Sequence, residues 1–192
     1  MGALETTDLE LMIRVKGGEV DCMAPLLDAH RMRIVHFLHR MVQNQAVAEE
    51  LAQEVFLRVY RARARYEPTA TFTAWIYRIA ANLASNWRRH RRLEGCQQSL
   101  DESLPGMRRR ELKDRRPNME QIFLDQARLA EIRDAVAELP ERQRVVVLMH
   151  KYDEMEYVEI AQALGCSIPT VKSLLFRAYG ALRVRLGHMA VQ

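Results

Sequence analysis

The sequence of 192 residues has no apolar run that approaches the roughly 20 residues needed to cross a bilayer. Its first residues, MGALETTDLELMIRV, carry acids where a secretory signal carries bases, and they have no long apolar centre. Three cysteines (Cys22, Cys96 and Cys166) are scattered and form no Cys-x-x-Cys pair, which favours reduced thiols over a disulfide framework. These absences predict a cytoplasmic protein without membrane insertion.

Sequence signatures of catalysis and of cofactor binding are also missing. The chain has no phosphate-cradling glycine loop, no nucleophile elbow and no carboxylate–histidine metal cluster. His36 and His39 are three residues apart on an expected helix, but no further Cys or His lies close by in sequence. An ordinary, partly buried pair is therefore favoured over a metal site. We expect no enzymatic activity, no cofactor and no metal.

Positive charge is concentrated in two zones of the chain, although the net charge is only +4. Residues 58–92 hold nine Arg against the single acid Glu67, and residues 170–192 hold four bases and no acid. Residues 1–30, by contrast, hold six acids and two bases. Because an ordinary solvated surface mixes the two signs, separated basic zones favour two contacts with a polyanion, and nucleic acid is the preferred interpretation.

Apolar spacing of 3.6 residues dominates, and no alternating strand pattern is convincing. The pattern predicts an all-α fold of two small helical domains, residues 1–92 and 119–192, joined by a flexible linker at 93–118 that is rich in mixed charge, Gly, Pro and Ser. Asp8 and Thr71 or Thr73 are candidate helix N-caps, and Gly17-Gly18 ends the first helix. The expected helices span residues 8–16, 21–42, 46–64, 71–92, 119–139, 140–151, 156–164 and 168–187.

Residues 157–177, YVEIAQALGCSIPTVKSLLFR, have the spacing of a helix-turn-helix. Gly165 can adopt the positive φ of the turn, Ser167 can cap the second helix, and Pro169 suits its first turn. The apolar positions of the second helix share one side. The polar side matches a recognition helix that enters the major groove of DNA, and its candidate contacts are Ser167, Thr170, Lys172, Ser173 and Arg177.

The helix expected at 71–92, TFTAWIYRIAANLASNWRRHRR, has two distinct sides. Phe72, Ile76, Ile79 and Leu83 form an apolar stripe for the core. An adjacent side combines an aromatic platform, amides and guanidinium groups, which are what unstacked bases and their phosphates require. Its members are Trp75, Arg78, Asn82, Asn86 and Arg89. We expect Trp87, which is nearer the apolar stripe, to pack in the core.

The helix expected at 46–64 also has a second face, which carries Glu50, Gln53, Glu54 and Leu57 beside its apolar stripe. From these residues alone, simple solvation of the acidic face and docking to a basic helical partner both stay open.

Two blocks of the sequence resemble those of bacterial extracytoplasmic-function (ECF) sigma factors. AEELAQEVFLRVYRARARYEPTATFTAWIYRIAANLASNWRRHRR resembles their region 2, and LPERQRVVVLMHKYDEMEYVEIAQALGCSIPTVKSLLFRAYGALRVRL resembles their region 4. The resemblance implies a factor that binds core RNA polymerase and directs it to a promoter. It implies that Glu50, Gln53, Glu54 and Leu57 dock on the clamp helices of the polymerase.

The resemblance also assigns the two basic zones. It implies that region 2 recognises and melts the −10 element through Tyr66, Thr71, Trp75, Arg78, Asn82, Arg88 and Arg89. Region 4 is expected to read the −35 element through the recognition helix and to meet the polymerase β-flap, and an anti-sigma factor is the expected regulator. The rival hypothesis is a helix-turn-helix regulator that binds duplex DNA without being a polymerase subunit.

Overall fold

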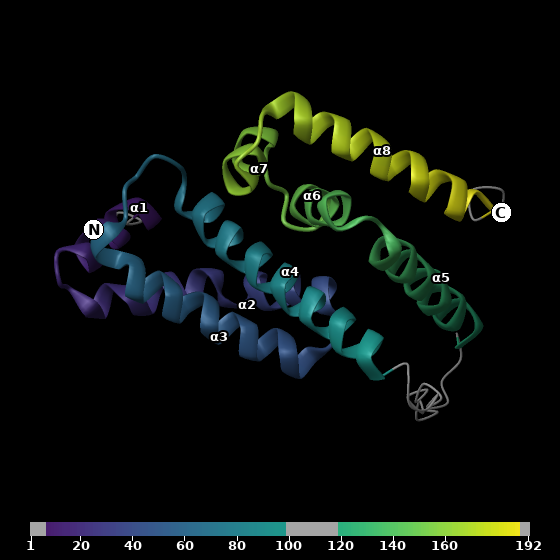
Figure 1. Ribbon diagram of the computed structural model, residues 1–192, viewed down its shortest axis with the longest axis horizontal. Coiled ribbons are helices and arrows are strands. Elements are labelled where there is room, and N and C mark those ends of the chain that lie inside the picture. The colour runs from purple at the N-terminus through teal and green to yellow at the C-terminus, as the bar shows by residue number, and fades with distance from the viewer. Residues whose placement is uncertain (1–6, 99–118, 189–192) are drawn as a thin grey trace.

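A computed structural model describes residues 7–98 and 119–188, and within these ranges the chain contains helices and no strand. The expected all-α class is confirmed (Figure 1). The α-helices are α1 (Asp8–Lys16), α2 (Met23–Val42), α3 (Gln45–Ala62), α4 (Phe72–Gln98), α5 (Met119–Glu138), α6 (Glu141–Lys151), α7 (Tyr157–Leu164) and α8 (Ile168–Leu186). Short 3₁₀ turns, η1 (Val20–Cys22) and η2 (Arg63–Arg65), precede α2 and follow α3. No described helix is long and apolar enough to span a membrane.

Helices α1 to α4 form the N-terminal half, in which α2, α3 and α4 pack against one another. The Thr71 hydroxyl accepts a hydrogen bond from the Ala74 amide at 3.1 Å, so Thr71 caps α4 as expected. The prediction of Asp8 as the cap of α1 was wrong. Thr7 caps that helix in a capping box with Glu10, and this frees the Asp8 carboxylate to pair with the buried His30 at 2.7 Å.

Helices α5 to α8 form the C-terminal half. Pro140 precedes α6 as its N-cap residue, and Gly165 ends α7 in the left-handed region at φ +59°, both as the sequence predicts. Ser167 accepts a hydrogen bond from the Thr170 amide at 3.4 Å, and Pro169 lies in the first turn of α8. The predicted helix-turn-helix is therefore present at α7–α8.

Two predicted features between the halves differ from the structure or lie outside it. The helix expected to end at Arg92 continues to Gln98, because nothing in residues 93–98 interrupts the backbone hydrogen bonds of α4. The remainder of the predicted linker, residues 99–118, lies outside the described residues. The two halves also contact each other, since α4 packs on α7 and α2 packs on α6 (Figure 1), and their buried apolar residues form one continuous cluster.

Candidate functional site

The polar side of α4 carries Arg78, Asn82 and Arg89 as exposed side chains. Arg89 donates a hydrogen bond to Asn86 Oδ1 at 2.6 Å, which orients the guanidinium group along the helix surface. The opposite side buries Phe72, Ile76 and Leu83, and Tyr77 is fully buried with them. The predicted division of this helix into an apolar and a polar side is present in the structure.

The two aromatic residues expected at the start of this surface pack against each other. Tyr66 is only 3% exposed, and its ring centroid lies 4.9 Å from that of Trp75. Trp75 is half-buried and also meets Phe72 edge to face at 6.0 Å. Burial raises the pKa of the Tyr66 hydroxyl. The Tyr66 ring therefore packs against the Trp75 ring, and less of the Trp75 ring is exposed to solvent than its position on the helix indicated.

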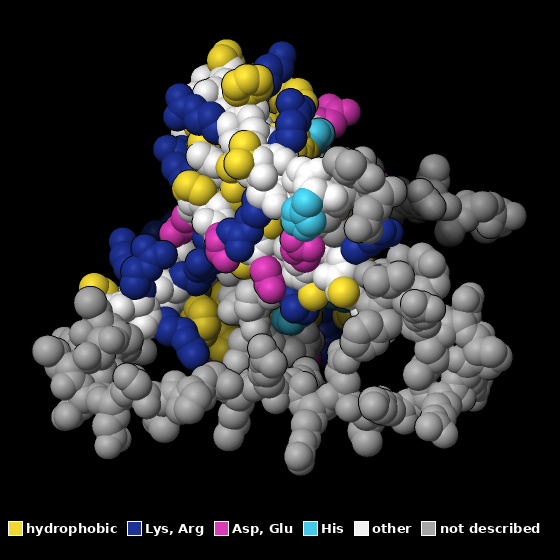
Figure 2. Space-filling model, turned by 90° about the vertical axis from the view of Figure 1, so that its right-hand side faces the viewer, with side chains coloured by type: hydrophobic (Ala, Val, Ile, Leu, Met, Phe, Trp, Pro, Cys, Tyr) yellow, Lys and Arg dark blue, Asp and Glu magenta, His cyan; other side chains and the backbone are white. Residues whose placement is uncertain are grey.

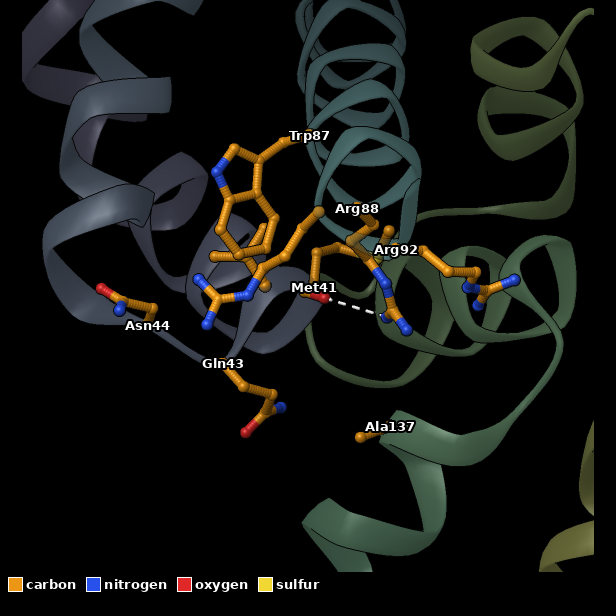
Figure 3. Close-up of a pocket in the computed structure, with 9 residues that line it drawn as sticks. Met41, Gln43, Asn44, Trp87, Arg88, Arg92 and Ala137 are labelled. Carbon is orange, nitrogen blue, oxygen red and sulfur yellow. Dashed lines mark hydrogen bonds between the residues drawn. The ribbon is translucent and has the colours of Figure 1, made fainter. Parts of the chain in front are cut away.

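Arg88 and Arg89, although adjacent, point in different directions. Arg88 is half-buried and donates a hydrogen bond to the Met41 carbonyl oxygen at 3.1 Å (Figure 3). Burial and the nearby Arg92 lower the pKa of Arg88. Trp87 packs against the core as expected, and Arg91 lies over its ring at 5.4 Å. Arg88 thus ties the end of α2 to α4, whereas Arg89 is the exposed cation of the pair.

A recess of about 280 Å³ separates the polar side of α4 from the C-terminal half. Arg78, Ala81 and Asn82 line it from α4, and residues of α6 and α7 line it from the other side, among them Glu141 and Val145. At the start of α4, the Thr71 hydroxyl donates a hydrogen bond to the Glu159 carboxylate of α7 at 3.4 Å. Thr71, Arg78 and Asn82 therefore face another part of the same chain.

A second surface lies along α2 and α3 on a different side of the N-terminal half. Leu27, Val35 and Phe56 form the apolar part of a groove of about 560 Å³, and Gln53 and Leu57 lie on its α3 side. Leu57 is 48% exposed. The structure thus brings two of the predicted docking residues together in a groove whose α2 wall the sequence analysis missed, although the apolar spacing of α2 could have indicated it.

The acidic residues of this face differ in their surroundings. Glu50 is exposed, and Glu54 accepts a hydrogen bond from Arg58 at 2.7 Å, which lowers the pKa of the Glu54 carboxyl. Glu49, which the sequence analysis did not single out, lines the groove. The lining of the groove thus places two acids, Asp28 and Glu49, and one base, Arg31, around its apolar centre, whereas Glu50 and Glu54 are not part of the lining.

The third surface is the outer side of α8. Lys172, Ser173 and Arg177 are exposed there, whereas Thr170 is half-buried and its hydroxyl lies 2.9 Å from that of Ser167. Figure 2 shows Lys and Arg side chains interspersed with apolar ones on the upper part of the face it presents, where α8 lies. Sequence analysis missed two exposed apolar residues of this helix, Phe176 at 82% and Val184 at 88%.

No group of three or more metal-ligating side chains occurs within the described part of the chain. His39 is half-buried and His36 is exposed. Burial and the neighbouring Arg40 lower the pKa of His39. The free cysteines that the structure describes are Cys22 and Cys166.

Two family profiles match this sequence, one in each half. "Sigma-70 region 2" matches residues 26–94. "Sigma-70, region 4" matches residues 129–182. The first match spans most of α2 to most of α4, and the second spans the second half of α5 to most of α8, so both include the surfaces described above.

Several curated proteins are similar along nearly the whole chain. RNA polymerase sigma factor CarQ of Myxococcus xanthus is 32% identical over 94% of this chain and 98% of its own length. ECF RNA polymerase sigma factor SigW of Bacillus subtilis is 28% identical over 93% and 98%, respectively. The ECF sigma-E factor of Escherichia coli is 28% identical over 93% of both.

Two solved structures share the fold. CnrH, solved in complex with the cytosolic domain of CnrY, aligns with a TM-score of 0.67 at 20% identity and covers 93% of this chain and 96% of its own. The sigma factor RpoE of Bartonella quintana, solved with the anti-sigma factor NepR, aligns with a TM-score of 0.64 at 20% identity over 85% and 96%.

Proposed function

This chain belongs to the ECF group of RNA polymerase sigma factors, and we propose that three separate surfaces of the fold bind core polymerase, the −10 element and the −35 element. As a sigma factor it is not an enzyme: it binds core RNA polymerase and promoter DNA. The groove of α2 and α3 docks on polymerase, the polar side of α4 takes the −10 element, and the outer side of α8 reads the −35 element.

Polymerase docking is assigned to the α2–α3 groove because it combines an exposed apolar centre with acids of α3 in and beside its lining. An amphipathic basic helix, such as a clamp helix of the largest polymerase subunit, would bury Leu57 and meet Gln53 in the groove, and it would meet Glu50 and Glu54 on the part of α3 beside it. The Glu54–Arg58 pair has to exchange partners or remain at the edge of this contact.

Replacing Leu57 by Asp is expected to weaken core polymerase binding about 10- to 100-fold, because a central apolar contact becomes a buried charge. The side chain is 48% exposed, so the fold should be retained. Titration of labelled protein with core enzyme measures the affinity. The matched control is Leu9→Asp, an equally exposed leucine of α1 (41%), and an equal loss in both variants would contradict the docking assignment.

The −35 assignment derives from α8, whose start is fixed by the Ser167 cap and Pro169. Lys172, Ser173 and Arg177 extend from one exposed side of this helix and suit phosphates and guanine edges. Ser167 and Thr170 already hydrogen-bond to each other, so their role is to set the first turn of the helix and to offer a small polar edge to the DNA.

The double variant Lys172→Ala/Arg177→Ala is expected to lower initiation from −35-dependent promoters about 10-fold or more, and to reduce the salt dependence of binding. Run-off transcription by reconstituted holoenzyme at several salt concentrations checks both effects. Arg183→Ala, which removes an exposed cation from the same helix outside the motif, is the control. Unchanged activity of the double variant would refute the assignment.

We further propose a domain division of region 2 at residues 1–92 and region 4 at 119–192, joined by a linker at 93–118 whose first residues, 93–98, continue α4. The β-flap of polymerase is the proposed partner of region 4. The relative solved with the anti-sigma factor NepR supports an anti-sigma factor as the regulator of this chain as well. We also propose a cytoplasmic location, because a sigma factor acts together with core polymerase and promoter DNA.

The observation that carries the proposal is the presence of both sigma regions on one chain, each with an exposed surface of suitable chemistry. Transcription in vitro with purified core polymerase and a promoter library tests it: specific initiation is expected, and the starts define both promoter elements. A duplex-binding regulator would instead bind its operator tightly without polymerase and support no initiation.

A further inference from the structure

A polar pocket of about 360 Å³ lies where the end of α2 meets the last turns of α4, outside the three surfaces described above (Figure 3). Gln43 and Asn44, in the turn between α2 and α3, line one side of it, and Ala137 of α5 lines another. The wall formed by α4 carries three arginines, Arg88, Arg91 and Arg92. Among the residues that the structure describes, no acid lines this pocket, so its charge is strongly positive.

The positive charge of the three arginines is not neutralised within the described part of the chain. Positions 88, 91 and 92 are three and four residues apart on α4, so the side chains lie on one side of the helix and repel one another. Arg91 and Arg92 form no ion pair, and Arg88 donates its hydrogen bond to the neutral Met41 carbonyl oxygen at 3.1 Å. Burial and the charge of Arg92 lower the pKa of Arg88. A bound anion would relieve this repulsion.

The start of α3 adds to the positive potential of the pocket. Gln43 adopts the left-handed conformation at φ +57°, and this sharp turn brings the first turn of α3 beside the arginines of α4. Asn44 is the N-cap of α3, and its side chain accepts a hydrogen bond from the Val47 amide at 3.1 Å. The first N–H groups of a helix have no partner within the helix and carry partial positive charge, which favours anions. The arginines and the helix start therefore select for the same charge.

Trp87 gives the pocket an aromatic wall as well. Its side chain is half-buried, packs against the core and lines the pocket, and Arg91 lies over its ring at 5.4 Å. Figure 3 shows Arg88 between Trp87 and Arg92. The volume lies within the range of about 300–1,000 Å³ that is usual for small-molecule sites. Because the α2–α3 turn and α5 close other sides of the pocket, its shape suits a small anion better than an extended DNA strand.

We propose that this pocket binds a small ligand with two or more linked phosphates, such as a free nucleotide. Arg91 and Arg92 hold the phosphate chain through bidentate hydrogen bonds, and Arg88 adds a third positive charge while it keeps its bond to Met41. The Trp87 ring offers a stacking surface to a base. The site goes beyond the proposed function and does not depend on it, because neither polymerase nor promoter DNA is needed to fill it.

Calorimetric titration of the purified full chain at physiological ionic strength tests the proposal, with ATP, inorganic tripolyphosphate, AMP and inorganic phosphate as probes. We expect ATP and tripolyphosphate to bind saturably at one site. AMP and inorganic phosphate should bind about 10-fold more weakly or worse, because a single phosphate engages fewer guanidinium groups. Tighter binding of ATP than of tripolyphosphate would assign a nucleotide, equal affinity would assign the phosphate chain alone, and both results support the pocket. Absence of saturable binding by ATP and tripolyphosphate would overturn it.

Two pairs of substitutions separate the pocket from net charge. Arg91→Ala/Arg92→Ala should weaken binding of tripolyphosphate about 10- to 100-fold, since two charge-assisted contacts are lost. Arg91→Lys/Arg92→Lys keeps the charge but not the bidentate geometry, and it should recover only part of the affinity. The matched control, Arg61→Ala/Arg65→Ala, removes two exposed arginines of the same half and should change the affinity by about twofold at most. An equal loss in the control pair would mean that net charge alone attracts the ligand, and it would overturn the site.

A third variant tests the enclosed shape of the site without changing any charge. Ala137 is half-buried and lines the pocket, so Ala137→Leu should fill part of it and weaken ATP binding about 10-fold. The melting temperature without ligand checks that this variant is folded. If Ala137→Leu binds ATP normally while Arg91→Ala/Arg92→Ala loses affinity for ATP and for a single DNA strand alike, the arginines are contacts for DNA phosphates and the pocket proposal fails. None of these results bears on initiation by the holoenzyme, so the proposed function is tested separately.

Discussion

Replacing Arg78 and Asn82 together by Ala is expected to slow promoter opening by holoenzyme about 10- to 100-fold while leaving closed-complex formation nearly unchanged. Both side chains are exposed on α4, so their loss costs the fold little. Duplex DNA hides base edges and faces until strands separate, so groups that hold an unstacked base act after opening begins. A hydrogen bond that involves a charged group contributes about 1.5–3 kcal/mol and a neutral one about 0.5–1.5 kcal/mol, so the loss of both side chains supports the expected factor. Permanganate reactivity of unpaired thymines measures opening, and competitor-resistant binding measures the closed complex.

Arg14→Ala is the control for this pair, because it removes an exposed cation from the same half at a site away from α4. Trp75→Ala should share the opening defect, but it also deprives Tyr66 and Phe72 of a packing partner and should lower the melting temperature. The exposed pair is therefore the cleaner test. An equal loss of closed and open complexes would contradict the assignment of melting to this side of α4.

Local chemistry explains which features of the fold the sequence could predict. Gly165, Ser167 and Pro169 each satisfy a requirement of the backbone within a few residues, so the turn and the start of α8 follow from their order alone. The same holds for Thr71 at the start of α4. Asp8 shows the limit of such rules: Thr7 and Asp8 are both good caps, and the choice depends on His30, 22 residues away.

Contacts between distant segments explain what the sequence could not predict. A helical wheel places Trp75 on the polar side of α4. It cannot predict that Tyr66 packs against the Trp75 ring, because packing sets the path of the loop before Thr71. Similarly, Ala81 and Ala163 are unremarkable in sequence, and their burial depends on α4 meeting α7. The sequence could predict only one wall of the α2–α3 groove for the same reason: Gln53 and Leu57 lie on α3, but the other wall is α2.

Asp153, a buried residue between α6 and α7 that contacts Arg33 of α2, makes the packed arrangement of the two halves, called the closed form here, dependent on pH. Burial raises the pKa of its carboxyl from 3.8 to about 6, against the opposing effects of Tyr77, Arg33, Arg40 and His36. In the open form these groups leave and the pKa returns towards 3.8. The closed form therefore binds more protons between these values: its stability is greatest below pH 3.8 and is lost as pH rises to about 6. The whole change amounts to about 3 kcal/mol.

Replacing Asp153 by Asn, which keeps the shape and removes the charge, is expected to favour the closed form at pH 7.5 by about 100-fold and to make it independent of pH. Wild type should instead open about 10-fold further between pH 5 and pH 7.5. Energy transfer between dyes on Arg14→Cys and Arg183→Cys, with native cysteines replaced, reports the separation of the halves. Asp134→Asn, an exposed acid of α5, is the matched control and should follow wild type. A persistent pH response in Asp153→Asn would assign the proton to another group. A more open Asp153→Asn at pH 7.5 would mean that attraction of the carboxylate to Arg33 and Arg40 outweighs the cost of burying it.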